Sequence, residues 1–132
     1  MNWSTFPSSA NLSSWLWDDI PEVRTHTAHN KNEGVGHYQP GGTATFAAGE
    51  LVRYMKQKEE DFRGLGRWCS TVFYSNPNHR TRLVAAYNVG RQSPKGLKTI
   101  YQQQLRFIQL HGLDTAPSRL FLTDFVAQLM TW

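Results

Sequence analysis

The chain has 132 residues, of which 39% are apolar and 18% are charged. This length fits one domain with a real core, and the apolar fraction excludes a disordered tail or a polar linker. The 14 Lys and Arg residues outnumber the 10 Asp and Glu residues, an excess that suits a polyanionic partner but is also typical of an ordinary surface.

The cysteine content and the apolar runs predict an intracellular protein, of cytoplasm or nucleus, that is not secreted. Cys69 is the single cysteine, so no internal disulfide can form, and its apolar surroundings predict a small buried side chain. No segment resembles a secretory signal, and no apolar run approaches the ~20 residues of a membrane helix. We therefore expect no membrane partner.

The first third of the chain, residues 1–39, is rich in Ser, Asn, Thr and His. Pro7 and Pro21 would interrupt any long helix there, so we expect mostly loop. One short helix is predicted over residues 13–20, after a Ser pair that could cap it.

Two groups of residues in this predicted loop raise the question of a metal. Three histidines have no fourth ligand at suitable spacing and are interpreted as solvated rather than as a zinc site: His26, His29 and His37. An acidic group could hold magnesium, but a charged helix start explains it equally well: Asp18, Asp19 and Glu22. No metal site is predicted from the residues present.

Strands and turns dominate residues 40–87. A strand is predicted over residues 43–47, and Gly41 and Gly42 before it are expected to form an ordinary turn. Residues 49–66 fit either a strand end with a charged loop or a short helix. Their acidic run, residues 59–61, lies among Lys and Arg and is interpreted as a solvated loop.

Residues 67–74 and 81–87 are two apolar, β-rich runs joined by residues 75–80, in which Ser, Asn and Pro favour a turn. This pattern predicts an antiparallel hairpin with a somewhat long loop and two buried strands. Arg67 and Trp68 could clamp a nucleic acid by stacking. A core Trp and a surface Arg is the preferred interpretation.

Two amphipathic helices are predicted after Pro94. Apolar residues at helical spacing line the first, which is expected to end near Gly112: Leu97, Tyr101, Leu105 and Ile108. The second starts around Pro117, and its apolar stripe is wide: Phe121, Phe125 and Leu129, flanked by Leu122, Val126 and Met130. Three strands and two helices leave strand faces or edges uncovered, so we expect the chain to be part of something larger.

Five segments in this order resemble the endonuclease/exonuclease/phosphatase domains of retroelement-like sequences. They are Tyr38-Gln39-Pro40-Gly41-Gly42-Thr43-Ala44, Gly64-Leu65-Gly66-Arg67-Trp68, Ala85-Ala86-Tyr87, Thr99-x-Tyr101-x-Gln103, and Pro117-Ser118-Arg119 with Phe121 and Asp124. The resemblance covers most of the chain from about Tyr38 onward.

The resemblance implies an α+β fold, namely part of a four-layer α/β/β/α sandwich, over a single incomplete domain of residues 1–132. It also implies a magnesium-dependent phosphodiesterase whose site lies at one end of the sandwich, with Glu, Asn, Asp and His groups around the metal. The Asp-x-Asn and Ser-Asp-His motifs of that family occur nowhere in this sequence. We therefore expect the chain to hold no magnesium and to be inactive alone.

One functional position carries over from the family. Tyr87 matches the Tyr of an Ala-Tyr-x-Pro motif, whose phenol can hydrogen-bond the scissile phosphate. Val89 stands where Pro is usual, which bears on the placement of Asn88 and Arg91, the two candidate substrate-binding residues. The expected partners are DNA and the missing part of the domain.

Two functions follow as expectations. The first is a fragment of a mobile-element endonuclease. The second is a non-catalytic nucleic-acid-binding or interaction module that keeps the scaffold without the catalytic groups. The basic excess of the chain is compatible with both.

Overall fold

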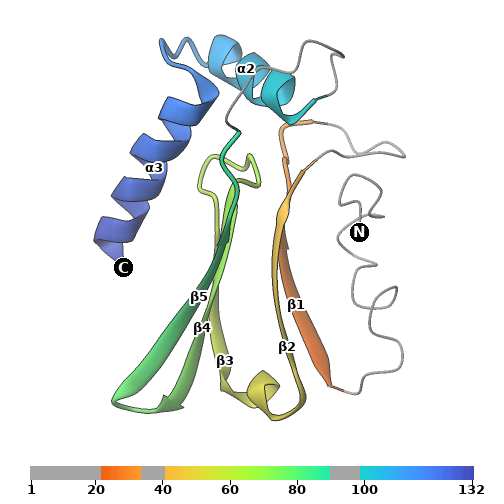
Figure 1. Ribbon diagram of the computed structural model, residues 1–132, viewed down its shortest axis with the longest axis vertical. Coiled ribbons are helices and arrows are strands. Elements are labelled where there is room, and N and C mark those ends of the chain that lie inside the picture. The colour runs from red at the N-terminus through yellow and green to blue at the C-terminus, as the bar shows by residue number, and fades with distance from the viewer. Residues whose placement is uncertain (1–21, 34–40, 90–98) are drawn as a thin grey trace. The chain divides into compact units, whose positions relative to one another are not determined.

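The structure is a computed structural model that describes residues 22–33, 41–89 and 99–132. The chain divides into two compact units, Met1–Tyr87 and Asn88–Trp132. The described strands lie in the first unit and the described α-helices in the second (Figure 1). The α+β class is therefore confirmed. The predicted helix over residues 13–20 lies outside the described residues.

The described residues of the first unit form two antiparallel sheets that face each other (Figure 1). In the smaller sheet, β1 (Val23–Ala28) pairs with β2 (Thr43–Ala48). A 3-10 helix, η3 (Gly49–Tyr54), leads to the larger sheet. That sheet has the order β3 (Met55–Glu60), β4 (Trp68–Asn76), β5 (His79–Ala86).

The predicted strand over residues 43–47 is confirmed as β2, but the expected loop over residues 1–39 is wrong for β1. Three of the six residues of β1 are Val or Thr, which suit a pleated surface, and all six pair with β2. For residues 49–66 the sequence left open a short helix or a strand end with a charged loop. The structure has parts of both, because the 3-10 helix η3 precedes the strand β3.

The predicted hairpin is confirmed as β4 and β5, with a shorter turn than expected. Pro77 and Asn78 alone separate the strands. The side-chain Oδ1 of Asn76 accepts a hydrogen bond from the backbone N of Asn78 at 2.9 Å, as in an Asx turn. Burial was predicted for both strands and is wrong for β5, which lies at the edge of the described sheet and has no buried residue.

The space between the two sheets is lined by small and polar side chains. The hydroxyls of Thr45 on β2 and Thr71 on β4 are 2.7 Å apart and both residues are buried. Cys69 is fully buried and its Sγ lies 3.7 Å from the carbonyl oxygen of His26. The prediction of a small buried cysteine is confirmed, and burial raises the pKa of its thiol.

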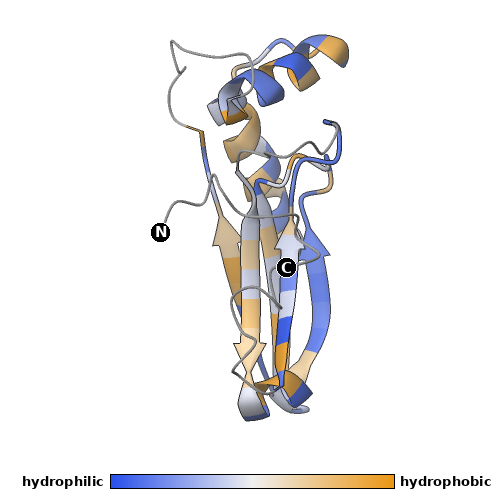
Figure 2. Cartoon of the chain, turned by 90° about the vertical axis from the view of Figure 1, so that its right-hand side faces the viewer, coloured by the Kyte–Doolittle hydropathy of each residue, from blue (hydrophilic) through white to orange (hydrophobic). Residues whose placement is uncertain are grey.

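The second unit contains α2 (Ile100–Leu110) and α3 (Pro117–Thr131), as predicted. Thr99 caps α2, because its Oγ1 accepts a hydrogen bond from the backbone N of Gln102 at 3.2 Å. Gly112 follows α2 with φ of 63°, and Pro117 opens α3. Hydrophilic and hydrophobic residues alternate along α2 (Figure 2).

The predicted apolar faces of both helices need correction. In α2 the buried residues are Gln103, Gln104, Phe107 and Ile108, so only Ile108 of the expected stripe is buried and Leu97 lies outside the described residues. In α3 the buried side is set by Pro117, Leu120, Phe121 and Asp124. Leu122, Val126, Leu129 and Met130 are exposed. Neither helix is long and apolar enough to cross a membrane.

Replacing Gly66 by Ala should destabilise the first unit more than replacing Gly49. Both glycines have left-handed φ, 72° and 64°, which costs a residue with a Cβ about 1–2 kcal/mol. A Cβ at Gly66 would also lie 2.6 Å from backbone atoms of His29, whereas a Cβ at Gly49 meets nothing within 4 Å. Urea unfolding should show a further loss of about 1–3 kcal/mol for Gly66→Ala. Equal losses in the two variants would contradict this packing.

Candidate functional site

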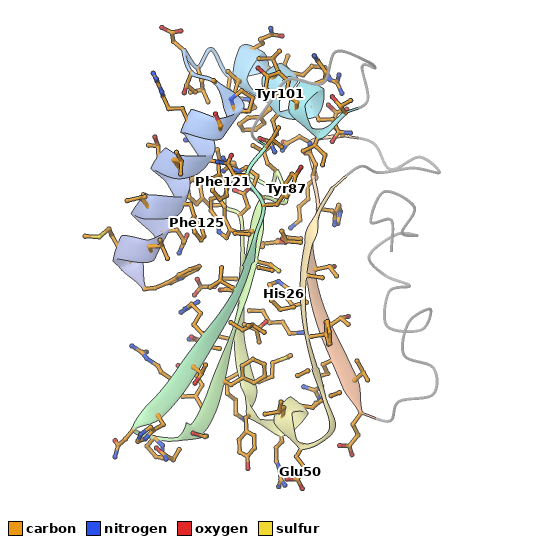
Figure 3. All side chains as sticks on the ribbon, viewed as in Figure 1. His26, Glu50, Tyr87, Tyr101, Phe121 and Phe125 are labelled. Atoms are coloured by element: carbon orange, nitrogen blue, oxygen red, sulfur yellow. The ribbon has the colours of Figure 1, made fainter. Side chains whose placement is uncertain are left out.

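Three segments of the first unit meet at one end of the larger sheet: residues 30–32 after β1, residues 61–67 between β3 and β4, and Tyr87 after β5. We call this set the loop end. β3 and β5 finish there and β4 starts there, because the three strands are antiparallel. Figure 3 shows Tyr87 at this end and Glu50 of η3 at the opposite end.

A buried ion pair organises residues 61–67. Asp61 and Arg67 have side chains that are each 1% exposed. The Oδ2 of Asp61 accepts from Nε of Arg67 at 2.6 Å, and its Oδ1 accepts from Nη2 at 2.9 Å. Two backbone N–H groups, those of Arg63 and Arg67, also donate to this carboxylate. The interpretation of Asp61 as part of a solvated loop is therefore wrong.

The expectation of a core Trp68 and a surface Arg67 is only half confirmed. Trp68 is fully buried, which confirms a core Trp, but Arg67 is buried as well, so the surface Arg is wrong. The guanidinium of Arg67 lies 4.7 Å from the ring centroid of Trp68. Because both side chains are enclosed by the protein, neither is in a position to clamp a nucleic acid.

The two glutamates before Asp61 lie on β3 rather than in a loop. Glu60 forms an ion pair with Lys31, and Oε2 of Glu59 lies 3.3 Å from Nη1 of Arg82 on β5. The same guanidinium nitrogen donates to the hydroxyl of Ser70 at 2.9 Å. The charges of these two glutamates are thus compensated by Lys31 in the turn after β1 and by Arg82 on β5. The strand β3 is hydrophilic along most of its length (Figure 2).

Backbone hydrogen bonds fix residues 61–67 against the turn after β1. The N of Lys31 donates to the carbonyl oxygen of Gly64 at 2.7 Å. The side-chain amide of Asn32 donates to the carbonyl oxygens of Arg63 and Gly64, each at 3.2 Å. Asn30 forms an isolated antiparallel bridge with Leu65. The loop between β3 and β4 is therefore held against residues 30–32.

Tyr87, the predicted phosphate contact, lies directly beside this loop. Its backbone N donates to the carbonyl oxygen of Arg67 at 2.8 Å, and the residue is 49% exposed. Asn88 follows it and is exposed. Arg91 lies outside the described residues. The structure therefore brings Tyr87, but not the full predicted set, together with the loop end.

An exposed aromatic residue of the loop end was missed by the sequence analysis. Phe62 is 58% exposed, and its ring meets that of Trp68 edge-on at 5.6 Å between centroids. The guanidinium of Arg63 lies over the Phe62 ring, 5.6 Å from its centroid. An apolar residue within a charged run was the available signal.

His26 lies between the two sheets (Figure 3). Its Nδ1 is 3.2 Å from the carbonyl oxygen of Ser70, so this nitrogen carries the donated proton. Burial lowers the pKa of His26, and the Ser70 carbonyl partly offsets that effect. Lys58 and Lys31 lower the pKa further, whereas Glu60 raises it.

No group of three or more His, Cys, Asp or Glu residues that could hold a metal ion occurs within residues 22–33, 41–89 and 99–132. Of the three histidines considered for zinc, His37 lies outside these ranges. Of the acidic group considered for magnesium, only Glu22 is described, and it is exposed.

Comparison with known proteins gives no further assignment, because no family model, no curated protein and no solved structure matches this chain. The resemblance to endonuclease/exonuclease/phosphatase domains therefore rests on the quoted sequence segments and stays a prediction. So does the intracellular location.

Asp61→Ala should strongly destabilise the first unit. It leaves the buried guanidinium of Arg67 without its carboxylate, a change that costs about 3–5 kcal/mol in comparable buried pairs. Glu50→Ala is the matched control, because it removes a carboxylate from an exposed pair with Arg53 and should change stability little. Urea unfolding measures both. Similar stability of the two variants would show that the Asp61 carboxylate is not structurally important.

The stability of the protein should fall as the pH drops from about 7.5 to about 5.5, in part through His26. Because the folded-state pKa of His26 is lowered, the unfolded chain binds this proton more readily, so protonation favours unfolding below the ordinary value of 6.5. His26→Gln keeps a polar side chain but cannot titrate. Thermal melting at the two pH values should show a smaller loss for the variant than for the wild type, and an equal loss would exclude His26 as a contributor.

Proposed function

We propose that this chain supplies part of a magnesium-dependent phosphodiesterase domain of the endonuclease/exonuclease/phosphatase kind, acting on DNA, and that the loop end contacts the phosphate. A four-layer sandwich for the whole domain is part of the same proposal. The two facing sheets of the first unit are compatible with the inner layers of such a sandwich.

The observation that carries the proposal is the position of Tyr87. Its phenol is half exposed at the end of a strand, while its backbone is fixed to Arg67. A phenolic O–H at such an exposed position can donate to a non-bridging oxygen of a phosphodiester. Such a hydrogen bond strengthens as negative charge develops on the phosphoryl oxygens.

The carboxylate of the loop end, Asp61, and that of the adjacent Glu60 on β3 do not fit a magnesium ion. Asp61 is bound by Arg67 and Glu60 is paired with Lys31. A carboxylate released to a metal would leave its own cation without a partner, which is costly where the pair is buried. In this proposal the metal ligands come from other residues of the domain, and the chain alone is inactive.

This engagement of the carboxylates also favours a second candidate function, a non-catalytic nucleic-acid-binding module. Both candidates require binding at the loop end, and they differ in whether the complete domain cleaves DNA with a metal.

Incubation of plasmid DNA with the chain and magnesium should leave the plasmid intact. Robust cleavage that EDTA abolishes would show that the chain holds its own metal centre and would contradict this part of the proposal.

Tyr87→Phe should weaken the binding of a short labelled DNA about tenfold, because a hydrogen bond to a charged group contributes roughly 1.5 kcal/mol. Fluorescence anisotropy at low salt measures the affinity, which should fall steeply as salt is added. Tyr74→Phe is the control, since Tyr74 lies on β4 away from the loop end and its phenol is 3.5 Å from Gln57. Absence of binding at low salt, or equal effects of the two variants, would refute the phosphate contact.

A further inference from the structure

Phe62 is the one exposed residue of the loop 61–67. The preceding Asp61 is 3% exposed and the ring neighbour Trp68 is fully buried, whereas Phe62 is 58% exposed. Leaving an aromatic side chain in water forgoes part of the ~1.5–3 kcal/mol that full burial would contribute. An isolated exposed apolar residue is common, but this one is held out by a rigid support.

The support is the network around Asp61 and Gly64. Asp61 fixes the loop through its hydrogen bonds to Arg63 and Arg67, and Gly64 is bound by Lys31 and Asn32. Trp68 fills the space beneath Phe62 and meets it edge-on, with 68° between the ring planes. The ring therefore has little freedom to turn inward, and little ordering is needed when it binds a ligand.

The chemistry around the ring selects the kind of ligand. Arg63 places a guanidinium 5.6 Å from the ring centroid, so an aromatic face and a delocalised cation lie together. Nucleobases stack on such surfaces whatever their sequence, because each base has a π face, and the cation favours the adjoining phosphates. Lys31 lies in the same loop end and is half exposed.

We propose that Phe62, with Arg63 over its ring, is a stacking platform for an unpaired nucleobase of the DNA whose phosphate Tyr87 contacts. This inference rests on the proposed function of the loop end. Bases inside a duplex are already stacked on their neighbours, so the platform makes the site selective for single-stranded or locally opened DNA over an intact duplex.

The test compares Phe62→Ala with wild type on two labelled ligands of equal length, an oligothymidylate and a base-free abasic oligonucleotide. Phe62→Ala should weaken oligothymidylate binding about 5- to 100-fold, the range expected for one lost base stack. It should leave binding of the abasic oligonucleotide unchanged, because that ligand offers phosphates only. Phe46→Ala is the matched control, since Phe46 is 47% exposed on β2 and lies outside the loop end.

A second variant guards against a simple loss of structure. Phe62→Trp keeps a stacking surface, so it should retain oligothymidylate affinity and show quenching of the added Trp fluorescence on binding. The stacking proposal would be overturned if the wild type bound both ligands equally and Phe62→Ala changed neither affinity. That result would leave the phosphate contact of Tyr87 standing. Tyr87→Phe without effect on either ligand would overturn the phosphate contact instead, and a failure of both ligands to bind would overturn both.

Discussion

The buried pair of Asp61 and Arg67 is the interaction on which the loop end depends. Removing two charges from water is costly, and the pair is tolerable because the carboxylate accepts two hydrogen bonds from the guanidinium and two from backbone N–H groups. Those backbone bonds close residues 61–67 into a fixed loop. Tyr87 is then held by the carbonyl oxygen of Arg67. One ion pair thus sets the positions of both exposed aromatic residues of the loop end.

The packing between the two sheets follows a related logic. Small and hydroxyl-bearing residues, such as Thr45 and Thr71, let the sheets approach closely and join by a hydrogen bond. A one-residue shift in register would turn these side chains to the opposite face and leave buried polar groups unsatisfied. The contacts of His26 with Ser70 and Cys69 also join the two sheets and favour the same register. Polar contacts therefore specify the alignment of the sheets more narrowly than apolar burial alone would.

Local patterns in the sequence were sufficient for the elements whose formation is local. The cap at Thr99, the turn at Pro77 and Asn78, and the helical start at Pro117 all depend on neighbouring residues, and the corresponding elements were predicted. β1 was missed because it forms by pairing with β2, which begins 15 residues after β1 ends. The residues of β1 suit a strand, but they do not by themselves indicate this distant partner. Asp61 was predicted to be solvated because a run of charged residues usually is. Its partner, Arg67, comes within reach only when the chain turns back at Gly66.

The position of Asp61 also separates binding from catalysis at the loop end. A carboxylate is an oxygen ligand of the kind that magnesium prefers. Here the carboxylate compensates Arg67, and transferring it to a metal would leave a buried guanidinium uncompensated at a cost of about 3–5 kcal/mol. The less costly arrangement keeps Asp61 structural, and the proposed contacts to phosphate and base fall to the exposed groups, Tyr87 and Phe62. We therefore propose a division of roles in which the loop end binds and orients DNA and other residues of the domain hold the catalytic metal.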